Sequence, residues 1–367
     1  MEERKAELHH IPELDGVRGI AILAVLLLHF HDPFQATRPL GLLSDIIARG
    51  YTGVDMFFVL SGFLITSILI STRGASNYFR AFYARRSLRI FPLAFFMIAL
   101  LYWIALPFAH RHGQLPKLPE SEQVWYWLFL GNWRQGLGFN DGAELGHFWS
   151  LAIEEQFYLM FSVFARFLHA RQLAIVSLGL AILSITLRVV ASTTGHGEDP
   201  AIWRLTFLHL DPIALGALLA CSTRFLAWSS RWRWVLIAAG VVGLTLPLPD
   251  GLTILAGGIG ATGLVALAAT RGSGLLRTPL LRSCGKYSYA MYVLQPTWIV
   301  APLAKKLPHS TPLMLGSLIL GPLVTYALAV LSWNLLEKHF LRLKKHFAYH
   351  YAPQGDNPED LIIEAAH

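Results

Sequence analysis

The stretch "LDGVRGIAILAVLLLHF", residues 14–30, decides the fold class of this chain. Ten residues without a charge or a strong hydrogen-bonding side chain separate Arg18 from His29. A helix that crosses a bilayer needs roughly 20 mostly apolar residues, and ionisable groups inside such a helix are costly. The stretch therefore predicts a membrane-spanning helix in which Arg18 and His29 require an explanation.

The rest of the chain has the same character. Of its 367 residues, 54% are hydrophobic and only 14% are charged, whereas a soluble domain typically carries about 25% charged residues. We expect an all-α, polytopic membrane helix bundle with about ten transmembrane helices. The predicted spans are residues 14–33, 53–71, 88–108, 147–166, 172–191, 203–221, 233–248, 251–270, 286–304 and 314–336.

The basic residues orient these helices. About two thirds of the 30 Lys and Arg residues fall on one side if the N-terminus is cytoplasmic, and cytoplasmic loops carry this excess. Both termini are therefore predicted to be cytoplasmic, with a membrane domain over 1–342 and a mobile cytoplasmic tail over 343–367. The net charge of +7 then reflects topology rather than a nucleic-acid partner. The two cysteines, Cys221 and Cys284, suggest neither a disulfide nor a metal site.

Arg18 and His29 are eleven residues apart, which on a helix is close to three full turns, so they share one face. Arg18 would lie near the cytoplasmic surface and His29 in the outer third of the membrane. Arg18 could simply be an anchor whose side chain extends to the interface. His29 could be the wet outer end of its helix, although the apolar run before it is too short to span a bilayer alone.

Other polar groups fall inside predicted spans. Asp55 begins the second span and could be either a helix cap or a catalytic partner, and Ser61 lies near the middle of that span. Glu154 and Glu155 are adjacent in the fourth span, where a functional role for at least one of them is the simpler explanation. Asp211 in the sixth span is a weaker candidate.

The predicted topology places His29, Asp55, Glu154 and Glu155 at a similar outer depth. A histidine held by a carboxylate suits general-base catalysis, because the carboxylate fixes the imidazole tautomer and stabilises the imidazolium. The same groups would also suit a proton-coupled transporter or flippase. The chain shows no paired halves with broken helices of the kind that many transporters have.

An arginine cluster follows the second span. If residues 78–90 form an interfacial helix, Arg85, Arg86 and Arg89 make one basic face. Such a face commonly binds acidic lipids, but guanidinium groups are equally suited to a phosphorylated cofactor. The chain has no Walker or dinucleotide-binding glycine motif that would indicate another mode of nucleotide binding.

These features together resemble a known family. Arg18 and His29 are followed in order by "DMFFVLSGFLIT", "RRSLRIFP", "HFWSLAIEEQFYL", "CGKYSYAMYVLQP" and "LLEKHF". This series, over about residues 11–342, resembles the acyltransferase-3 family of integral membrane acyltransferases. The resemblance implies transfer of an acyl group, commonly acetyl, from cytoplasmic acyl-CoA to a hydroxyl of a sugar, glycan or lipid-linked acceptor, in the bacterial cytoplasmic membrane and without a metal.

The resemblance also implies roles for particular residues. His29 would be the catalytic base, supported by Glu154 or Glu155. Tyr289 and Tyr292 fall in a further family motif, with a cavity or packing role. The residues that would hold or guide the CoA are Arg18, Arg85, Arg86 and Arg89.

Two positions depart from the family pattern. Gln295 stands where many relatives have a histidine before the proline, which argues against a proton-transfer role at that position. The sequence Glu337-Lys338-His339-Phe340 lacks the proline of the commoner "EKPF", so this helix end is expected to differ.

Overall fold

The computed structural model describes residues 10–31, 41–111, 122–137, 145–195, 203–246, 248–295 and 311–351. Within these ranges every regular element is helical, which confirms the all-α class. The predicted tail lies outside the described residues from 352 onward, as does the part of the predicted ninth span beyond residue 295.

The helices of the first half of the chain are separated mostly by short turns. Their bounds are α1 Pro12–His31, α2 Leu42–Ala48, α3 Thr52–Thr72, α4 Tyr78–Leu100, α5 Leu106–Arg111, α6 Gln123–Trp127, α7 Gly131–Gly136, α8 Phe148–Phe167 and α9 Ala170–Thr193. A π-helical turn, Leu101–Ala105, joins α4 to α5.

The second half continues in the same way. Its helices are α11 Asp211–Cys221, α12 Thr223–Arg231, α13 Arg233–Thr245, α14 Asp250–Thr270, α15 Pro279–Leu294, α17 Thr311–Ser332 and α18 Lys338–Arg342. A 3₁₀ turn (Thr206–Leu208) precedes α11. A π-helical turn (Trp333–Glu337) joins α17 to α18, and a second 3₁₀ turn (Leu343–Phe347) follows α18.

Six helical segments among the described residues are long and apolar enough to cross a membrane, and a seventh is added if the bent pair α11 and α12 is one span. The six are Pro12–His31, Leu42–Thr72, Tyr78–Phe108, Ala170–Thr193, Gly251–Thr270 and Thr311–Phe347. Three other predicted spans correspond to helices that are shorter or more polar: α13 has 13 residues, the described part of α15 has 16, and α8 carries Glu154, Glu155 and Arg166. The count of ten stays a prediction.

Two predicted boundaries differ for local reasons. The expected interfacial helix at 78–90 and the first part of the span at 88–108 are one helix, α4, which runs through Pro92 without a break. The rest of that span continues through the π-helical turn into α5. The sixth span begins at Asp211 rather than 203, because Pro212 occupies the first turn of α11, where a proline lacks only an amide proton that would have no intrahelical partner.

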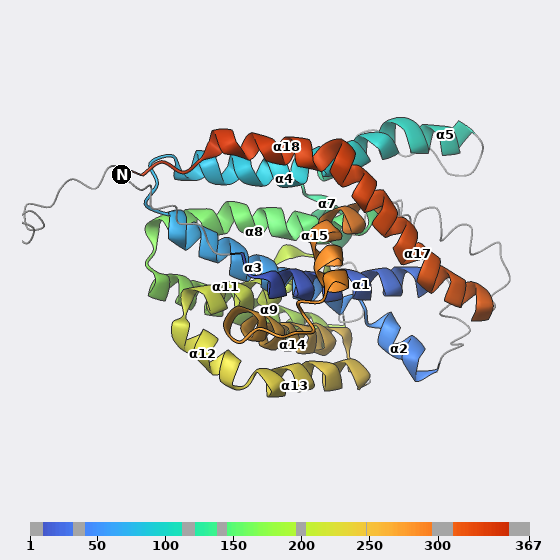
Figure 1. The fold of residues 1–367 in the computed structure, drawn as a ribbon. Coiled ribbons are helices and arrows are strands. Elements are labelled where there is room, and N and C mark those ends of the chain that lie inside the picture. Colours follow the sequence, from blue (N-terminus) through green and yellow to red (C-terminus); the bar gives the residue numbers. More distant parts are fainter. Residues whose placement is uncertain are drawn as a thin grey trace, which may run out of the picture.

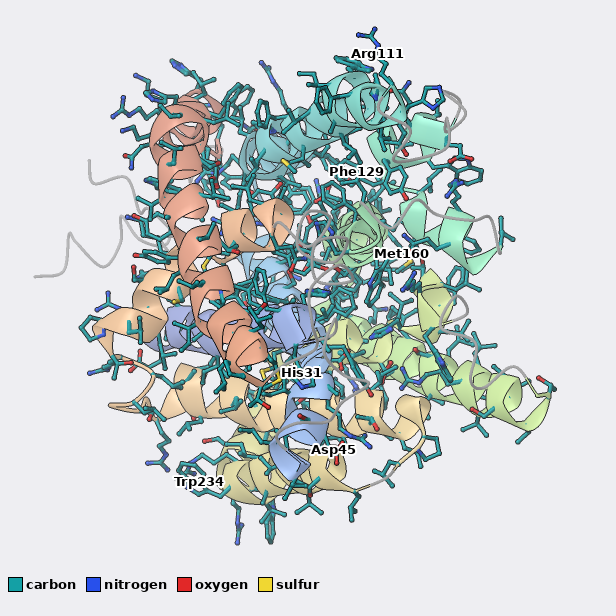
Figure 2. The ribbon with its side chains drawn as sticks, turned by 90° about the vertical axis from the view of Figure 1, so that its right-hand side faces the viewer. His31, Asp45, Arg111, Phe129, Met160 and Trp234 are labelled. Atoms are coloured by element: carbon teal, nitrogen blue, oxygen red, sulfur yellow. The ribbon has the colours of Figure 1, made fainter. Side chains whose placement is uncertain are left out.

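The helices form an elongated bundle in which α4 and α18 lie along one edge, α13 lies along the other, and α1 runs between them (Figure 1). In the end-on view, His31 at the end of α1 lies near the middle of the molecule, between Arg111 at one edge and Trp234 at the other (Figure 2). The central helix of the bundle is thus the one that carries Arg18 and His29.

Close contact between α1 and α15 fixes the position of these two residues. A side chain on Gly19 would collide with the backbone carbonyl of Leu281, and one on Gly285 would collide with the carbonyl of Asp15. Small residues at such crossings let helix backbones approach closely in a membrane. The approach brings the Gln295 end of α15 to the His29 end of α1.

The bundle buries aromatic side chains at its centre and exposes aliphatic ones at its edge. Phe58, Phe157 and Phe161 are fully buried, whereas Ile319 and Leu320 of α17 are each 62% exposed. Exposed aliphatic residues on long helices are the expected surface of a protein in contact with lipid. The site described next lies within the aromatic centre.

Candidate functional site

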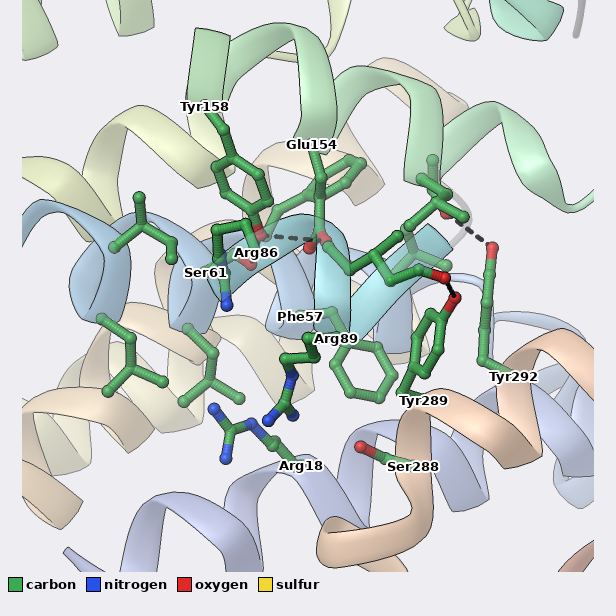
Figure 3. Close-up of a pocket in the computed structure, with 18 of the residues that line it drawn as sticks. Arg18, Phe57, Ser61, Arg86, Arg89, Glu154, Tyr158, Ser288, Tyr289 and Tyr292 are labelled. Carbon is green, nitrogen blue, oxygen red and sulfur yellow. Dashed lines mark hydrogen bonds between the residues drawn. The ribbon is translucent and has the colours of Figure 1, made fainter. Parts of the chain in front are cut away.

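A cavity of about 300 Å³ opens between α1, α3, α4, α8 and α15 (Figure 3). Aliphatic and phenylalanine side chains of α3 form most of its wall, and polar groups gather at its two ends. The polar side chains that line it are Arg18, Ser61, Arg86, Arg89, Ser150, Glu154, Tyr158, Ser288, Tyr289, Tyr292 and Lys344.

One end of the cavity is strongly basic. Arg18, Arg86, Arg89 and Lys344 all line it, and the guanidinium groups of Arg18 and Arg89 point toward each other (Figure 3). Arg18 donates a hydrogen bond to Asp15 at 2.8 Å, which offsets part of its charge. The buried Nε of Arg86 has no hydrogen-bond partner among the described residues. Spare donors on clustered cations are suited to bind an anion such as a phosphate.

Arg85 differs from the other arginines of the cluster. Its guanidinium donates to the backbone carbonyl of Lys344 at 3.3 Å and lies 5.8 Å from the ring centre of Tyr349. Arg85 does not line the cavity. The structure therefore gives it a contact with the C-terminal segment, while Arg86 and Arg89, on the same helix, face the cavity.

Lys344 was not expected at this site from the sequence. It belongs to the 3₁₀ turn after α18, in the segment predicted to be a tail, and that segment packs back onto the bundle. The side chain of Asn77, in the turn before α4, donates to the carbonyl of Ala348 at 2.7 Å, and the amide of Ser76 donates to that of His350 at 2.8 Å. These bonds hold residues 343–351 over the basic end of the cavity.

A chain of hydroxyl groups joins α3 to α8 along the cavity wall. The Ser61 hydroxyl lies 2.6 Å from the Tyr158 hydroxyl, which donates to Glu154 at 3.1 Å. The guanidinium of Arg86 lies 4.6 Å from the ring centre of Tyr158. Glu154 therefore faces the cavity beside a cation, whereas Glu155 does not line the cavity, and its buried Oε1 has no partner in the described ranges.

The other end of the cavity is formed by tyrosines. The Tyr289 hydroxyl donates to the carbonyl of Ile90 at 2.5 Å. The Tyr292 hydroxyl donates to the carbonyl of His147 at 2.7 Å and lies 2.6 Å from the Ser150 hydroxyl. Figure 3 shows both tyrosines on the side of the pocket away from Arg18. Tyr292 thus separates the cavity from His147.

His29 lies behind this tyrosine end rather than in the cavity lining. Its side chain interacts with that of Gln295, and it also interacts electrostatically with His147. The Nδ1 of His29 and the Nε2 of His147 are buried and have no hydrogen-bond partner among the described residues. His147 is part of a quoted motif, but no pattern along the chain singles it out.

Asp55 and Asp211 belong to a separate buried network. Asp55 pairs with Nε2 of His209 at 2.8 Å, not with His29. Asp211 accepts two hydrogen bonds from Arg188, at 2.6 and 2.5 Å, and a third from Ser184 at 3.0 Å. Neither carboxylate lines the cavity. The sequence identified both acids but neither of their basic partners.

The geometry of His209 shows how its protons are arranged. Its Nδ1 lies 2.9 Å from the carbonyl of Trp203, and a carbonyl only accepts, so this nitrogen carries a proton. A second proton is then shared between Nε2 and the carboxyl group of Asp55. The pair neutralises itself inside the membrane region, which favours a role in joining α3 to α11.

Comparison with known proteins identifies the family of this chain. The model of one family, described as "Acyltransferase domain" (acyltransferase-3), matches residues 11–333. The chain belongs to the acyltransferase-3 family. The resemblance seen in the sequence motifs is confirmed, and the whole cavity except Lys344 lies within the matched region.

Several curated relatives are O-acetyltransferases. The chain is 32% identical to O-acetyltransferase OatA of Staphylococcus aureus over 232 residues, 58% of this chain and 34% of the relative. It is 32% identical to the putative peptidoglycan O-acetyltransferase YrhL of Bacillus subtilis over 53% of this chain and 30% of the relative. It is 28% identical to peptidoglycan O-acetyltransferase OatA of Listeria monocytogenes over 59% of this chain and 34% of the relative.

The matches therefore span about a third of the length of these relatives. No solved structure matches the chain. The chain is thus a membrane acyltransferase-domain protein homologous to O-acetyltransferases.

Proposed function

We propose that this chain is a membrane O-acyltransferase that moves an acyl group, commonly acetyl, from acyl-CoA to a hydroxyl of a glycan or lipid-linked acceptor. The observation that carries the proposal is the polarity of the cavity. Arg86 and Arg89 suit phosphates, much of the wall is apolar, and Tyr292 connects the cavity to His147. The names of the relatives support acetyl as the group and a glycan as the acceptor.

The residues present fit a CoA thioester. Arg18, Arg86, Arg89 and Lys344 would bind its phosphate groups, since guanidinium and ammonium groups pair strongly with phosphate oxygens. The apolar wall would accept the less polar arm that connects these phosphates to the thioester. Arg85, on this proposal, supports the site through the backbone of Lys344 rather than through the donor.

His29 is the general base in this proposal. It removes the proton of the acceptor hydroxyl as the oxygen attacks the thioester carbon, and the thiolate of CoA leaves. Glu154 accepts a hydrogen bond from the Tyr158 hydroxyl and lies close to Arg86, so it acts on the cavity wall. Asp55 has a supporting role in this proposal: its bond to His209 holds α3 in register with α11.

The proposal includes the topology predicted from the sequence. With ten spans and both termini cytoplasmic in a bacterial cytoplasmic membrane, the basic end of the cavity faces the cytoplasm, where acyl-CoA is present. His29 then lies toward the outer face. The acyl group would pass through the bundle along the line from Arg18 to His29.

Purified protein in liposomes tests the proposal. Acetyl-CoA labelled in the acetyl group is added together with membranes from a bacterial host as the source of acceptors, and both release of CoA and base-labile label on the acceptors are measured. We expect both in the wild type, and a loss of about 100-fold or more in His29→Asn at equal protein levels. Movement of a solute without release of CoA would instead identify a transporter.

A further inference from the structure

Three polar side chains beyond Tyr292 have buried atoms that the described part of the structure leaves without a hydrogen bond, and two of them, His147 and Gln295, have no part in the chemistry described so far. Gln295, which ends α15, is 1% exposed, and neither its Nε2 nor its Oε1 has a hydrogen-bond partner among the described residues. The Nδ1 of His29 and the Nε2 of His147 are also buried without a hydrogen-bond partner among the described residues. We call His29, His147 and Gln295 the histidine cluster.

The members of the histidine cluster come from three helices that meet at one place. His29 lies at the end of α1, His147 directly precedes α8, and Gln295 follows the last residue of α15. The side chains of Gln295 and His29 lie close together without a well-formed hydrogen bond between them, and His29 is near enough to His147 for an electrostatic interaction. The bond from Tyr292 to the backbone of His147 joins the cluster to the cavity.

Such a group of unsatisfied atoms is expensive in a protein interior. A buried amide or imidazole nitrogen without a partner loses the hydrogen bonds that it makes in water, and native proteins pair most buried polar atoms. Four unsatisfied atoms in one cluster indicate a place prepared for a polar group that supplies both a donor and an acceptor. A hydroxyl group supplies both.

We propose that the histidine cluster is the binding site for the acceptor hydroxyl, with Gln295 as its hydrogen-bond donor and His147 as a second catalytic histidine. This inference rests on the proposed O-acyltransferase function. The amide of Gln295 donates to the hydroxyl oxygen, and one of the two imidazoles accepts the hydroxyl proton. A glutamine suits this task, since its amide offers both a donor and an acceptor.

The step balances with the groups present. The hydroxyl oxygen forms a bond to the acyl carbon as the bond from that carbon to the CoA sulfur breaks. The hydroxyl proton moves to a histidine nitrogen and then to the departing thiolate. With two neighbouring imidazoles, the one that takes the proton need not be the one that delivers it. The contact of His147 with Tyr292 places this exchange beside the tyrosine end of the cavity.

The test uses full-length protein in liposomes with host membranes as acceptors and labelled acetyl-CoA as donor. The variants are Gln295→Leu, Gln295→His and His147→Asn, and the readouts are label transferred to the membranes, acetyl-CoA affinity by calorimetry and thermal stability. Matched controls are Gln172→Leu and His169→Asn, two exposed positions at the start of α9 where the asparagine can also cap the helix.

We expect Gln295→Leu to lower transfer by about 10- to 100-fold and His147→Asn by about 100-fold or more. Gln295→His should keep most of the activity, and all variants should bind acetyl-CoA as the wild type does. If Gln295 is only an unsatisfied structural amide, leucine will instead raise thermal stability and leave transfer unchanged, which would overturn the proposal. Should Gln295→Leu fail to fold, full transfer by folded His147→Asn would have the same meaning.

Failure of the proposed function itself looks different. In that case the wild type releases no CoA and labels no acceptor, whatever the state of the histidine cluster. A wild type that transfers acetyl while the His147 and Gln295 variants match their controls contradicts the acceptor site alone.

Discussion

The hydroxyl of Tyr292 donates a hydrogen bond of 2.7 Å to the backbone carbonyl of His147. Tyr292 also lines the cavity, and its ring centre lies 5.5 Å from that of His147. One side chain therefore lines the cavity and contacts the histidine cluster. If a thioester in the cavity reacts with a hydroxyl at the histidines, as we propose, Tyr292 lies beside the reacting groups.

The first prediction concerns this contact. Tyr292→Phe keeps the ring but removes the bonds to His147 and Ser150. We expect acetyl transfer to fall by about 10-fold, because a net hydrogen bond contributes roughly 0.5–1.5 kcal/mol and its loss frees the start of α8. Acetyl-CoA affinity should be unchanged. Tyr287→Phe, on the same helix but outside the cavity lining, is the control; an equal loss in both variants would point to general disturbance of α15.

The second prediction separates two arginines of one helix. Arg89→Gln removes a cation from the cavity, so the acetyl-CoA concentration for half-maximal transfer should rise by about 10-fold or more, because a charged hydrogen bond is worth roughly 1.5–3 kcal/mol. Arg85→Gln removes a cation that faces Lys344 and Tyr349, and should leave this concentration within about threefold. Equal effects would favour a general attraction of anions or acidic lipid by the basic face over a phosphate site.

The sequence indicated many of the residues that line the cavity, but not which residues of other helices they contact. Arg86, Arg89 and Glu154 stand in motifs that could be read along the chain, and the structure brings them to one cavity. The helical period likewise put Arg18 and His29 on one face. Such periodicity concerns one helix at a time. It says which side chains turn the same way, and nothing about which helix they meet.

Contacts between helices that are far apart in the chain could not be predicted from the sequence. Asp55 meets His209, 154 residues away, because close packing sets the register of α3 against α11. No pattern along the chain encodes that register. Lys344 could not be placed from the sequence for a related reason. It follows the matched family region, and bonds from Arg85 and from the turn before α4 to this C-terminal segment bring it back to the cavity.

The third prediction tests this C-terminal contribution. Lys344→Gln should raise the acetyl-CoA concentration for half-maximal transfer by about threefold to 10-fold, since it removes one of the cavity cations but leaves the arginines in place. Lys345→Gln, the exposed neighbour with the same change of charge, serves as the control. Identical curves for the two variants would show that residue 344 acts only through the overall charge of the segment.

The fourth prediction concerns stability. Arg188 and Asp211 are 3% and 0% exposed and form a bidentate ion pair between α9 and α11. Replacing one member leaves the other charge buried and unpaired, so Arg188→Met or Asp211→Leu alone should each destabilise the protein by about 3–5 kcal/mol. The double variant should be far more stable than the sum of the two losses, because neither charge remains. Thermal unfolding in one detergent measures all four proteins, and strictly additive losses would mean that the two side chains do not depend on each other.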